Sequence, residues 1–250
     1  MLGKHHFSLS VATYLAVFAP LILVRPWLFC LFGFGVSVGS LLPDVDGEDA
    51  TIFHQTFKGT QGWLGGALRF VVRPLSIFFP YIGYLVKYVV YRPTVWLYDL
   101  LLPQDMTTAH RGYTHSHLGI WTTSTVIAAL ISLVSSSMGA FTASSVVTTY
   151  CGLVFGMYLH IVQDSCTKSG IVWNFPFSNK ALRGDRRTGP KASETPIQVF
   201  LCFLVIFAGI SLGVVLYHDP PVFAAIGANM LTVSIPWIGF LWGVHNARLT

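Results

Sequence analysis

Long apolar runs dominate the chain, and a few prolines and charged residues separate them. Six runs approach the roughly 17–25 residues that a helix needs to cross a bilayer, so we expect an all-α, polytopic transmembrane helical bundle of about six spans. The first run is interpreted as a span and not as a cleavable signal, because it lacks an A-x-A site and a second apolar run follows at once. The predicted spans cover about 7–24, 27–42, 118–138, 142–162, 196–217 and 222–244.

The segment 47–109 departs from this pattern. It is apolar and aromatic, but prolines interrupt it and cations recur along it, namely Arg69, Arg73, Lys87 and Arg92. Such a segment is typical of a helix that lies in the membrane interface or re-enters it. The alternative is a further span over 71–90, which is long enough to cross if Lys87 reaches back to the interface.

Composition supports a membrane protein. Of the 250 residues 53% are hydrophobic and only 10% are charged, against about 25% charged residues in soluble domains. The four cysteines have no CxxC spacing, which argues against a thiolate zinc site. We expect one membrane domain, 1–250, made of a first helical hairpin (1–46), an interfacial insert (47–109), a motif-bearing hairpin and loop (110–178), and a basic loop with a last hairpin (179–250).

The basic residues predict the orientation. If the insert does not cross, the spans pair into three hairpins, and both termini share one face with the 43–117 and 163–195 loops. Of the 15 lysines and arginines, all but Arg25 then fall on this face. Because cytoplasmic loops carry the excess of such residues, we expect a multi-pass protein of the cell membrane with both termini cytoplasmic. The net charge of +5 therefore reflects orientation, and nucleic acid is not an expected partner.

The same alternation of spans brings polar motifs to the cytoplasmic face. Two histidines precede the first span, "LLPDVD" ends the second, "HRGYTHSH" opens the third and "HIVQD" ends the fourth. Helix ends in a small bundle can approach one another, so we expect a metal site there. The candidate ligands are His6, Asp44, Asp46, His110, His115, His160 and Asp164.

His160 and Asp164 form the best-defined pair. They are four residues apart, so a helix presents both on one face, where they can chelate one ion or bridge two with ligands from other helices. Two alternatives stay open. His160 can lie among lipid headgroups while Asp164 caps the next turn, and the two aspartates of "LLPDVD" can be a polar stop after a span. Three further histidines have no convergent partners: His54, His218 and His245.

The ligand types indicate the metal. Imidazoles and carboxylates without thiolates suit a divalent ion, zinc first, with manganese or iron as alternatives. One catalytic zinc uses three protein ligands and an open position, which is fewer than the candidates here. The surplus favours two ions, or one ion with a separate base.

The motifs also carry a resemblance. "LLPDVD", then "HRGYTHS", then "GMYLHIVQDSCTKSGIVWNFPF" resemble, in order and in their relation to the spans, the YdjM-like family of membrane-bound metal-dependent hydrolases over residues 1–178. The resemblance implies a hydrolase in the cytoplasmic membrane, with Thr167, Gly170 and the following aromatic segment next to the metal helix. By motif match it implies a site formed by His6, Asp44, Asp46, His110, Arg111, His115, His160 and Asp164.

Together these observations predict a membrane-embedded hydrolase acting at the cytoplasmic surface. A metal-bound water is the expected nucleophile, a carboxylate such as Asp46 or Asp164 its base, and Arg111 a cation for phosphate or developing negative charge. Membrane lipids surround the protein, and a lipid or phosphoester is the expected substrate. The alternatives are a transporter of metal ions or protons, or a noncatalytic scaffold; transport sites usually lie near the bilayer midplane, where these spans carry almost no ligands.

Overall fold

The computed structural model describes residues 3–47, 50–53, 77–101, 112–178, 180–184, 195–244 and 248–249. The fold is all-α, as predicted. Among the described residues, the only strands are β1 (Leu182–Arg183) and β2 (Arg248–Leu249), which pair as a short antiparallel ladder. The helices are α1 (Gly3–Phe18), α2 (Leu21–Val24), α3 (Pro26–Gly39), α5 (Phe79–Leu85), α6 (Arg92–Leu101), α7 (His117–Ser137), α8 (Ala143–Ser165), α9 (Thr195–His218) and α10 (Val222–Val244). Short 3-10 turns are η1 (Leu42–Asp46), η2 (Thr51–Phe53) and η4 (Tyr113–His115), and a π-helical segment, η3 (Val86–Tyr91), joins α5 to α6.

Four helices are long and apolar enough to cross a membrane: α7, α8, α9 and the Val222–Gly239 part of α10. They correspond to the third to sixth predicted spans. The first two predicted spans form shorter helices, of 16 residues in α1 and 14 in α3. At 1.5 Å per residue these helices are about 24 and 21 Å long, below the hydrocarbon thickness of about 30 Å. Length and composition therefore support four spans.

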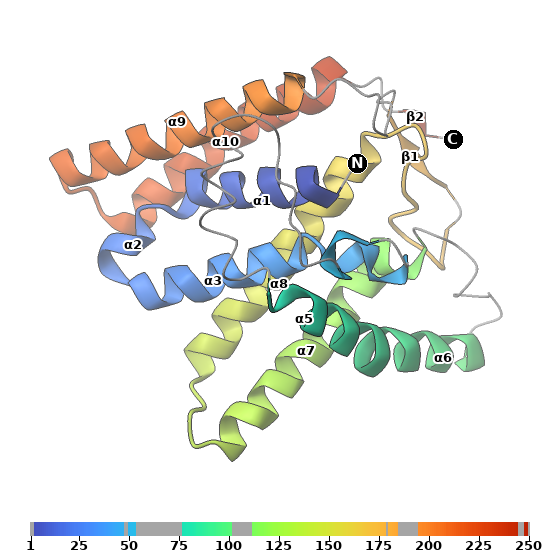
Figure 1. Ribbon diagram of the computed structural model, residues 1–250. Coiled ribbons are helices and arrows are strands. Elements are labelled where there is room, and N and C mark those ends of the chain that lie inside the picture. The colour runs from blue at the N-terminus through green and yellow to red at the C-terminus, as the bar shows by residue number, and fades with distance from the viewer. Residues whose placement is uncertain are drawn as a thin grey trace.

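The helices pair as three hairpins (Figure 1). The first joins α1 to α3 through α2, the second joins α7 to α8, and the third joins α9 to α10. Helix α1 packs on α9 and α10 on one side and on α3 and α8 on the other. The start of α1, the end of α3, the start of α7 and the end of α8 meet on the side opposite the hairpin tips, and these four ends carry the predicted ligands.

Glycines bring α3 and α8 unusually close. Gly35 and Gly39 on α3 face Gly152 and Gly156 on α8, each pair being four residues apart. A Cβ atom at Gly35 would lie 2.6 Å from the backbone oxygen of Thr149, so no larger residue fits without separating the helices. Small residues at this spacing allow the backbones of two membrane helices to touch. Because both helices run toward the same end of the bundle, the contact sets the end of α3 beside the end of α8.

Polar contacts fasten the last hairpin to α1. The Asn229 amide of α10 donates to the Ser211 hydroxyl at 2.7 Å and to the Val17 carbonyl at 3.2 Å. The Trp237 indole donates to the Thr13 hydroxyl at 3.1 Å. Hydrogen bonds between membrane helices typically contribute about 0.6 kcal/mol each. These contacts therefore help to fix the position of α9 and α10, and none of them involves a predicted ligand.

The described part of the 47–109 insert is helical from Phe79 to Leu101. We call α5, η3 and α6 together the rod. The rod includes Lys87 and Arg92. The alternative span over 71–90 begins earlier, and its residues 71–76 lie outside the described residues. One stripe of the rod is buried against the protein, and the opposite side is exposed. The prediction that the insert lies in the membrane interface remains a prediction.

Candidate metal centre

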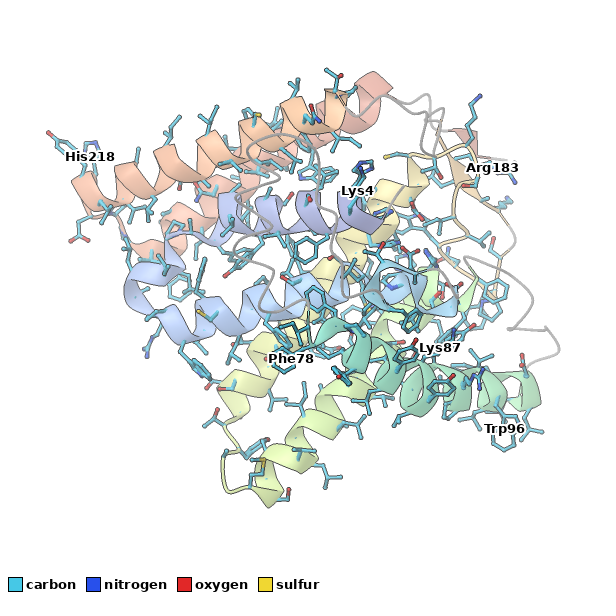
Figure 2. The ribbon with its side chains drawn as sticks, in the orientation of Figure 1. Lys4, Phe78, Lys87, Trp96, Arg183 and His218 are labelled. Atoms are coloured by element: carbon cyan, nitrogen blue, oxygen red, sulfur yellow. The ribbon has the colours of Figure 1, made fainter. Side chains whose placement is uncertain are left out.

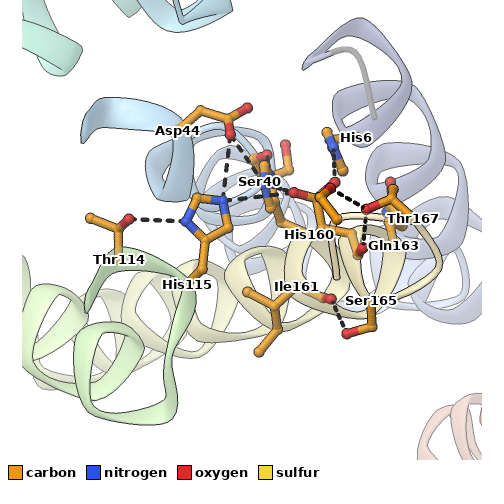
Figure 3. A network of polar contacts seen from close by, with 12 residues as sticks. His6, Ser40, Asp44, Thr114, His115, His160, Ile161, Gln163, Ser165 and Thr167 are labelled. Carbon is orange, nitrogen blue, oxygen red and sulfur yellow. Dashed lines mark hydrogen bonds and ion pairs between the residues drawn. The ribbon is translucent and has the colours of Figure 1, made fainter. Parts of the chain in front are cut away.

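Asp44 reaches the centre from the turn that follows α3. Pro43 is the second residue of η1, which redirects the chain after the end of α3. The Asp44 Oδ1 atom lies 3.5 Å from Nε2 of His115 and 3.5 Å from Nε2 of His160 (Figure 3). Burial raises the pKa of this carboxyl group, but the favourable electrostatic interaction with the neighbouring imidazoles, His160 first and then His115, outweighs burial and holds the pKa well below its usual range. Asp44 is therefore an anionic ligand.

His160 and Asp164 project from the last turns of α8, on one helical face as predicted. The His160 Nδ1 atom donates a hydrogen bond to the Ser40 carbonyl at 2.7 Å. A neutral imidazole that donates through Nδ1 has its lone pair on Nε2. Here Nε2 is buried, has no hydrogen-bond partner among the described residues and lies near the carboxylates of Asp44 and Asp164. The Asp164 Oδ2 atom is 3.8 Å from it. A backbone carbonyl behind a histidine is a common way to orient a metal ligand.

His115 comes from the "YTHS" turn in front of α7. The Ser116 hydroxyl caps α7 by accepting from the Gly119 N–H at 3.1 Å and donates to the Tyr113 carbonyl at 2.7 Å. The His115 Nδ1 atom is 3.0 Å from the Thr114 hydroxyl, and its Nε2 atom is 3.8 Å from Oδ2 of Asp164. The hydroxyls of this motif therefore build the turn and orient the imidazole.

Four ligand atoms, one each from Asp44, His115, His160 and Asp164, lie within 4.8 Å of one another. The carboxylate–imidazole separations of 3.5 to 3.8 Å are longer than hydrogen bonds. They are close to the separation of about 3.3–3.4 Å between ligands of a tetrahedral zinc with bonds of about 2.0–2.1 Å. The side chains of His115, His160 and Asp164 are fully buried, while that of Asp44 is 23% exposed. The cluster therefore fits a divalent cation approached from the Asp44 side.

His6 adjoins the four-ligand cluster without belonging to it. Its ring stacks on the His160 ring with centroids 3.9 Å apart, and its Nε2 atom is 3.1 Å from Oδ1 of Asp164. Asp164 thus directs one oxygen into the cluster and the other toward His6. This places a fully buried imidazole where it can orient Asp164 or bind a second ion that shares this carboxylate.

The other predicted residues have different surroundings. Asp46 lies on the same turn as Asp44 but is not one of the four clustered ligands. Burial and the nearby Asp46 charge raise the pKa of Tyr91, on the rod, to about 12, so Asp46 lies close to the rod. His117 is turned away, with Nδ1 3.0 Å from the Tyr158 hydroxyl. Two predicted residues, His110 and Arg111, lie outside the described residues.

Sequence reasoning missed the residues that support the ligands. Ser40 and Thr114 orient the two imidazoles, and Gln163, fully buried beside Asp164, donates to the Ser10 hydroxyl at 3.2 Å. Among the supporting residues, only the glycines could have been predicted from the sequence. Both "GVSVG" and "GLVFG" have the small-xxx-small spacing that is typical of close helix contacts.

Comparison with known proteins agrees with this architecture. The family model described as YdjM inner membrane protein matches residues 1–243. The chain belongs to this family. The match extends past the motif region, which ends at 178, through the last hairpin to α10. No curated protein and no solved structure matches the chain. With its four apolar helices, this YdjM-family protein is a membrane protein with a His/Asp group able to bind a metal ion.

Proposed function

We propose that this YdjM-family protein is a metal-dependent hydrolase that acts at the cytoplasmic surface of the membrane on a lipid or phosphoester. The observation that carries the proposal is the buried group of two imidazoles and two carboxylates at the ends of membrane helices. Asp44, His115, His160 and Asp164 would hold the cation, which would supply Lewis acidity and would activate water as the nucleophile.

Other residues of the chain have proposed roles in orienting the ligands, accepting a proton and binding negative charge. The hydrogen bonds from Ser40 and Thr114 hold the imidazoles in the orientation that binding needs. Asp46, on the same turn but outside the four-ligand cluster, is the proposed general base. Arg111, four residues before His115, is proposed to bind the phosphate or the developing negative charge.

Zinc is the proposed metal, with manganese or iron as alternatives, because the ligands are imidazole nitrogens and carboxylate oxygens. The four-ligand cluster accounts for one ion. A second ion requires His6 together with Oδ1 of Asp164, which are 3.1 Å apart. Elemental analysis of the purified protein therefore separates one ion per chain from two.

The proposed topology has six membrane-inserted helical segments and both termini in the cytoplasm. It rests on the hairpin arrangement and on the sequence positions of the fifteen lysines and arginines, of which all but Arg25 fall in segments predicted to share the ligand face. Reporter tags near 139 and 219 should give extracytoplasmic signals, and tags at the amino terminus and in 183–191 should give cytoplasmic signals. An extracytoplasmic signal at 183–191 contradicts this topology.

The function is tested by metal content and activity together. Purified protein should contain a divalent metal and hydrolyse at least one member of a panel of phosphoesters, phospholipids and acyl esters. His160→Ala should lose both properties and still insert, because the apolar content of α8 is unchanged. His218→Ala is the matched control, since His218 ends α9 at a hairpin tip, away from the ligands (Figure 2). Full metal occupancy in His160→Ala contradicts the assignment of His160 as a metal ligand. Metal flux into proteoliposomes without hydrolysis contradicts the proposed hydrolase activity and favours a transporter.

A further inference from the structure

The rod has an exposed face that no described part of the protein covers. Its buried residues are Phe79, Pro80, Gly83, Val86, Val90 and Val95. Other side chains of the rod are exposed and are large and apolar or aromatic, including Tyr81 at 67% and Leu100 at 69%. Trp96, labelled in Figure 2, is 67% exposed. Exposed apolar side chains that gather on one element are typical of an interaction site with a protein or a membrane.

The π-helical segment sets two cations about one turn apart along the rod. The Arg92 backbone N–H bonds to the Lys87 carbonyl, five residues earlier. In an α-helix, residues five apart point about 140° away from each other. The wider π turn instead sets Arg92 about one turn beyond Lys87, and such insertions are frequent at functional sites.

Aromatic rings connect the two cations. The Lys87 ammonium lies 5.0 Å from the centre of the Phe53 ring, and the Arg92 guanidinium lies 4.6 Å from that of Tyr88. The Tyr84 ring completes the series, at 4.9 Å from Phe53 and 6.4 Å from Tyr88. We call this series of five side chains the cation–aromatic row. Within the described parts of the chain, neither cation has a carboxylate at ion-pair distance, although Asp46 and Asp99 lie near the neighbouring Tyr91. The two cations of the row are therefore not engaged in ion pairs with these described residues.

A partner of this part of the rod must offer anionic groups to the two cations and apolar groups to the exposed side chains. An aqueous anion leaves Trp96 and Leu100 in water, and a second copy docked symmetrically on this face sets like charges against one another. A bilayer surface offers phosphates to the cations and hydrocarbon to the apolar side chains, and tyrosine and tryptophan favour this depth. We propose that the cation–aromatic row binds the phosphate of an anionic phospholipid and thereby holds the rod in the membrane interface.

This site goes beyond the proposed hydrolase activity and does not depend on it. It does adjoin the metal centre, because the rod's Val86 and Val90 share one hydrophobic cluster with Leu42 and Val45, which flank Asp44. A lipid bound to the row therefore sits beside the turn that carries this ligand.

The test compares nanodiscs of phosphatidylcholine alone with nanodiscs that also contain phosphatidylglycerol, and measures retained lipid by native mass spectrometry. Each cation near an anionic membrane surface contributes about fivefold to binding. Lys87→Gln combined with Arg92→Gln should therefore reduce the preference for phosphatidylglycerol by about twentyfold to thirtyfold. Arg92→Lys keeps the charge and should keep most of the preference.

The matched control is Lys180→Gln combined with Arg183→Gln, which removes two exposed cations outside the rod. The control should keep the wild-type preference. An equal loss in the control, or no loss in the rod variant, overturns the proposal. So does equal stabilisation by inorganic phosphate in phosphatidylcholine nanodiscs, which indicates a site for a soluble anion. If the double variant also loses bound metal, each single variant carries the test with an expected fivefold loss.

Depth gives an independent measurement. A fluorophore on Trp96→Cys should be quenched by labels at the headgroup and upper acyl-chain positions. Quenching only by an aqueous quencher, or only by a label at the bilayer midplane, overturns the interfacial placement of the rod. Metal content and hydrolysis are recorded for the same variants, so failure of the lipid site is distinguishable from failure of the proposed activity.

Discussion

Substituting Gly156 by alanine tests whether the close contact between α3 and α8 assembles the metal centre. A Cβ atom at this position would lie 2.9 Å from the Ser40 nitrogen and 3.0 Å from the Val36 Cα, and closer still to the Val36 carbonyl oxygen. Ordinary contacts between such atoms are about 3.5–4.0 Å. Helix α3 must therefore move away from α8 by at least about half an ångström.

That displacement exceeds what the ligands tolerate. Asp44 follows α3, whereas His160 and Asp164 belong to α8, so the substitution separates ligands of one ion. Metal–ligand distances vary by only about 0.2 Å in well-formed sites. We expect Gly156→Ala to lower metal affinity by about 10–100-fold, as loss of a ligand-orienting contact does, and to destabilise the protein by about 1–3 kcal/mol through overpacking.

The control is Gly213→Ala in α9, where nothing lies within 4 Å of the added methyl group. Alanine is better than glycine in a helix by about 0.5–1 kcal/mol, so this variant should be as stable as wild type or more stable. Affinity is measured by chelator competition, and stability by thermal unfolding with and without metal. Wild-type affinity in Gly156→Ala would falsify the view that the glycine contact sets the ligand geometry.

Three further substitutions separate the roles of other contacts. Thr114→Val removes the partner of the His115 Nδ1 atom and should weaken metal binding by about 10–100-fold in chelator competition; unchanged affinity contradicts its orienting role. Asn229→Leu removes two hydrogen bonds of the last hairpin and should lower stability by about 0.6–1.7 kcal/mol in thermal unfolding, while metal loss would contradict the separation of this hairpin from the site. Asp44 has a pKa well below its ordinary value of 3.8, so in metal-free protein its stabilising contribution is complete above about pH 4 and is lost as the pH falls through the lowered pKa. Metal-free Asp44→Asn should be less stable than wild type at neutral pH, with the difference closing in acid; a difference independent of pH rules this explanation out.

The helices and the meeting of their ends could be predicted because both depend on local patterns. Apolar runs identify the membrane helices, and their alternation alone brings the "LLPDVD", "YTHS" and "HIVQD" motifs to one side. The ends of the first two helices were less predictable, since α1 already ends at Phe18 and α3 at Gly39, whereas the predicted spans run to 24 and 42. Residues beyond these two ends are apolar, so hydropathy extends the predicted spans past the real helix ends.

The choice among neighbouring ligands could not be predicted. Asp44 and Asp46 are two residues apart, and only the 3-10 turn determines that Asp44 faces both imidazoles. The support from Ser40 is a backbone carbonyl, which every residue type provides, so the sequence contains no sign of it. His6 was predicted from its position alone, and its stacking on His160 depends on the packing of α1 against α8.

The hydrogen bond from His160 to Ser40 joins residues 120 positions apart, and this separation has a consequence for biogenesis. During synthesis the first hairpin emerges with Asp44 long before the ribosome reaches α8, so the ligand cluster stays incomplete until the fourth long stretch of helix has entered the membrane. Closing a loop of this length carries an entropic cost, which ion binding offsets only after closure. The metal should therefore bind late in the biogenesis of the protein, and metal starvation should lead to full-length, membrane-inserted chains in which the contact between α3 and α8 is less stable than in the metal-bound protein.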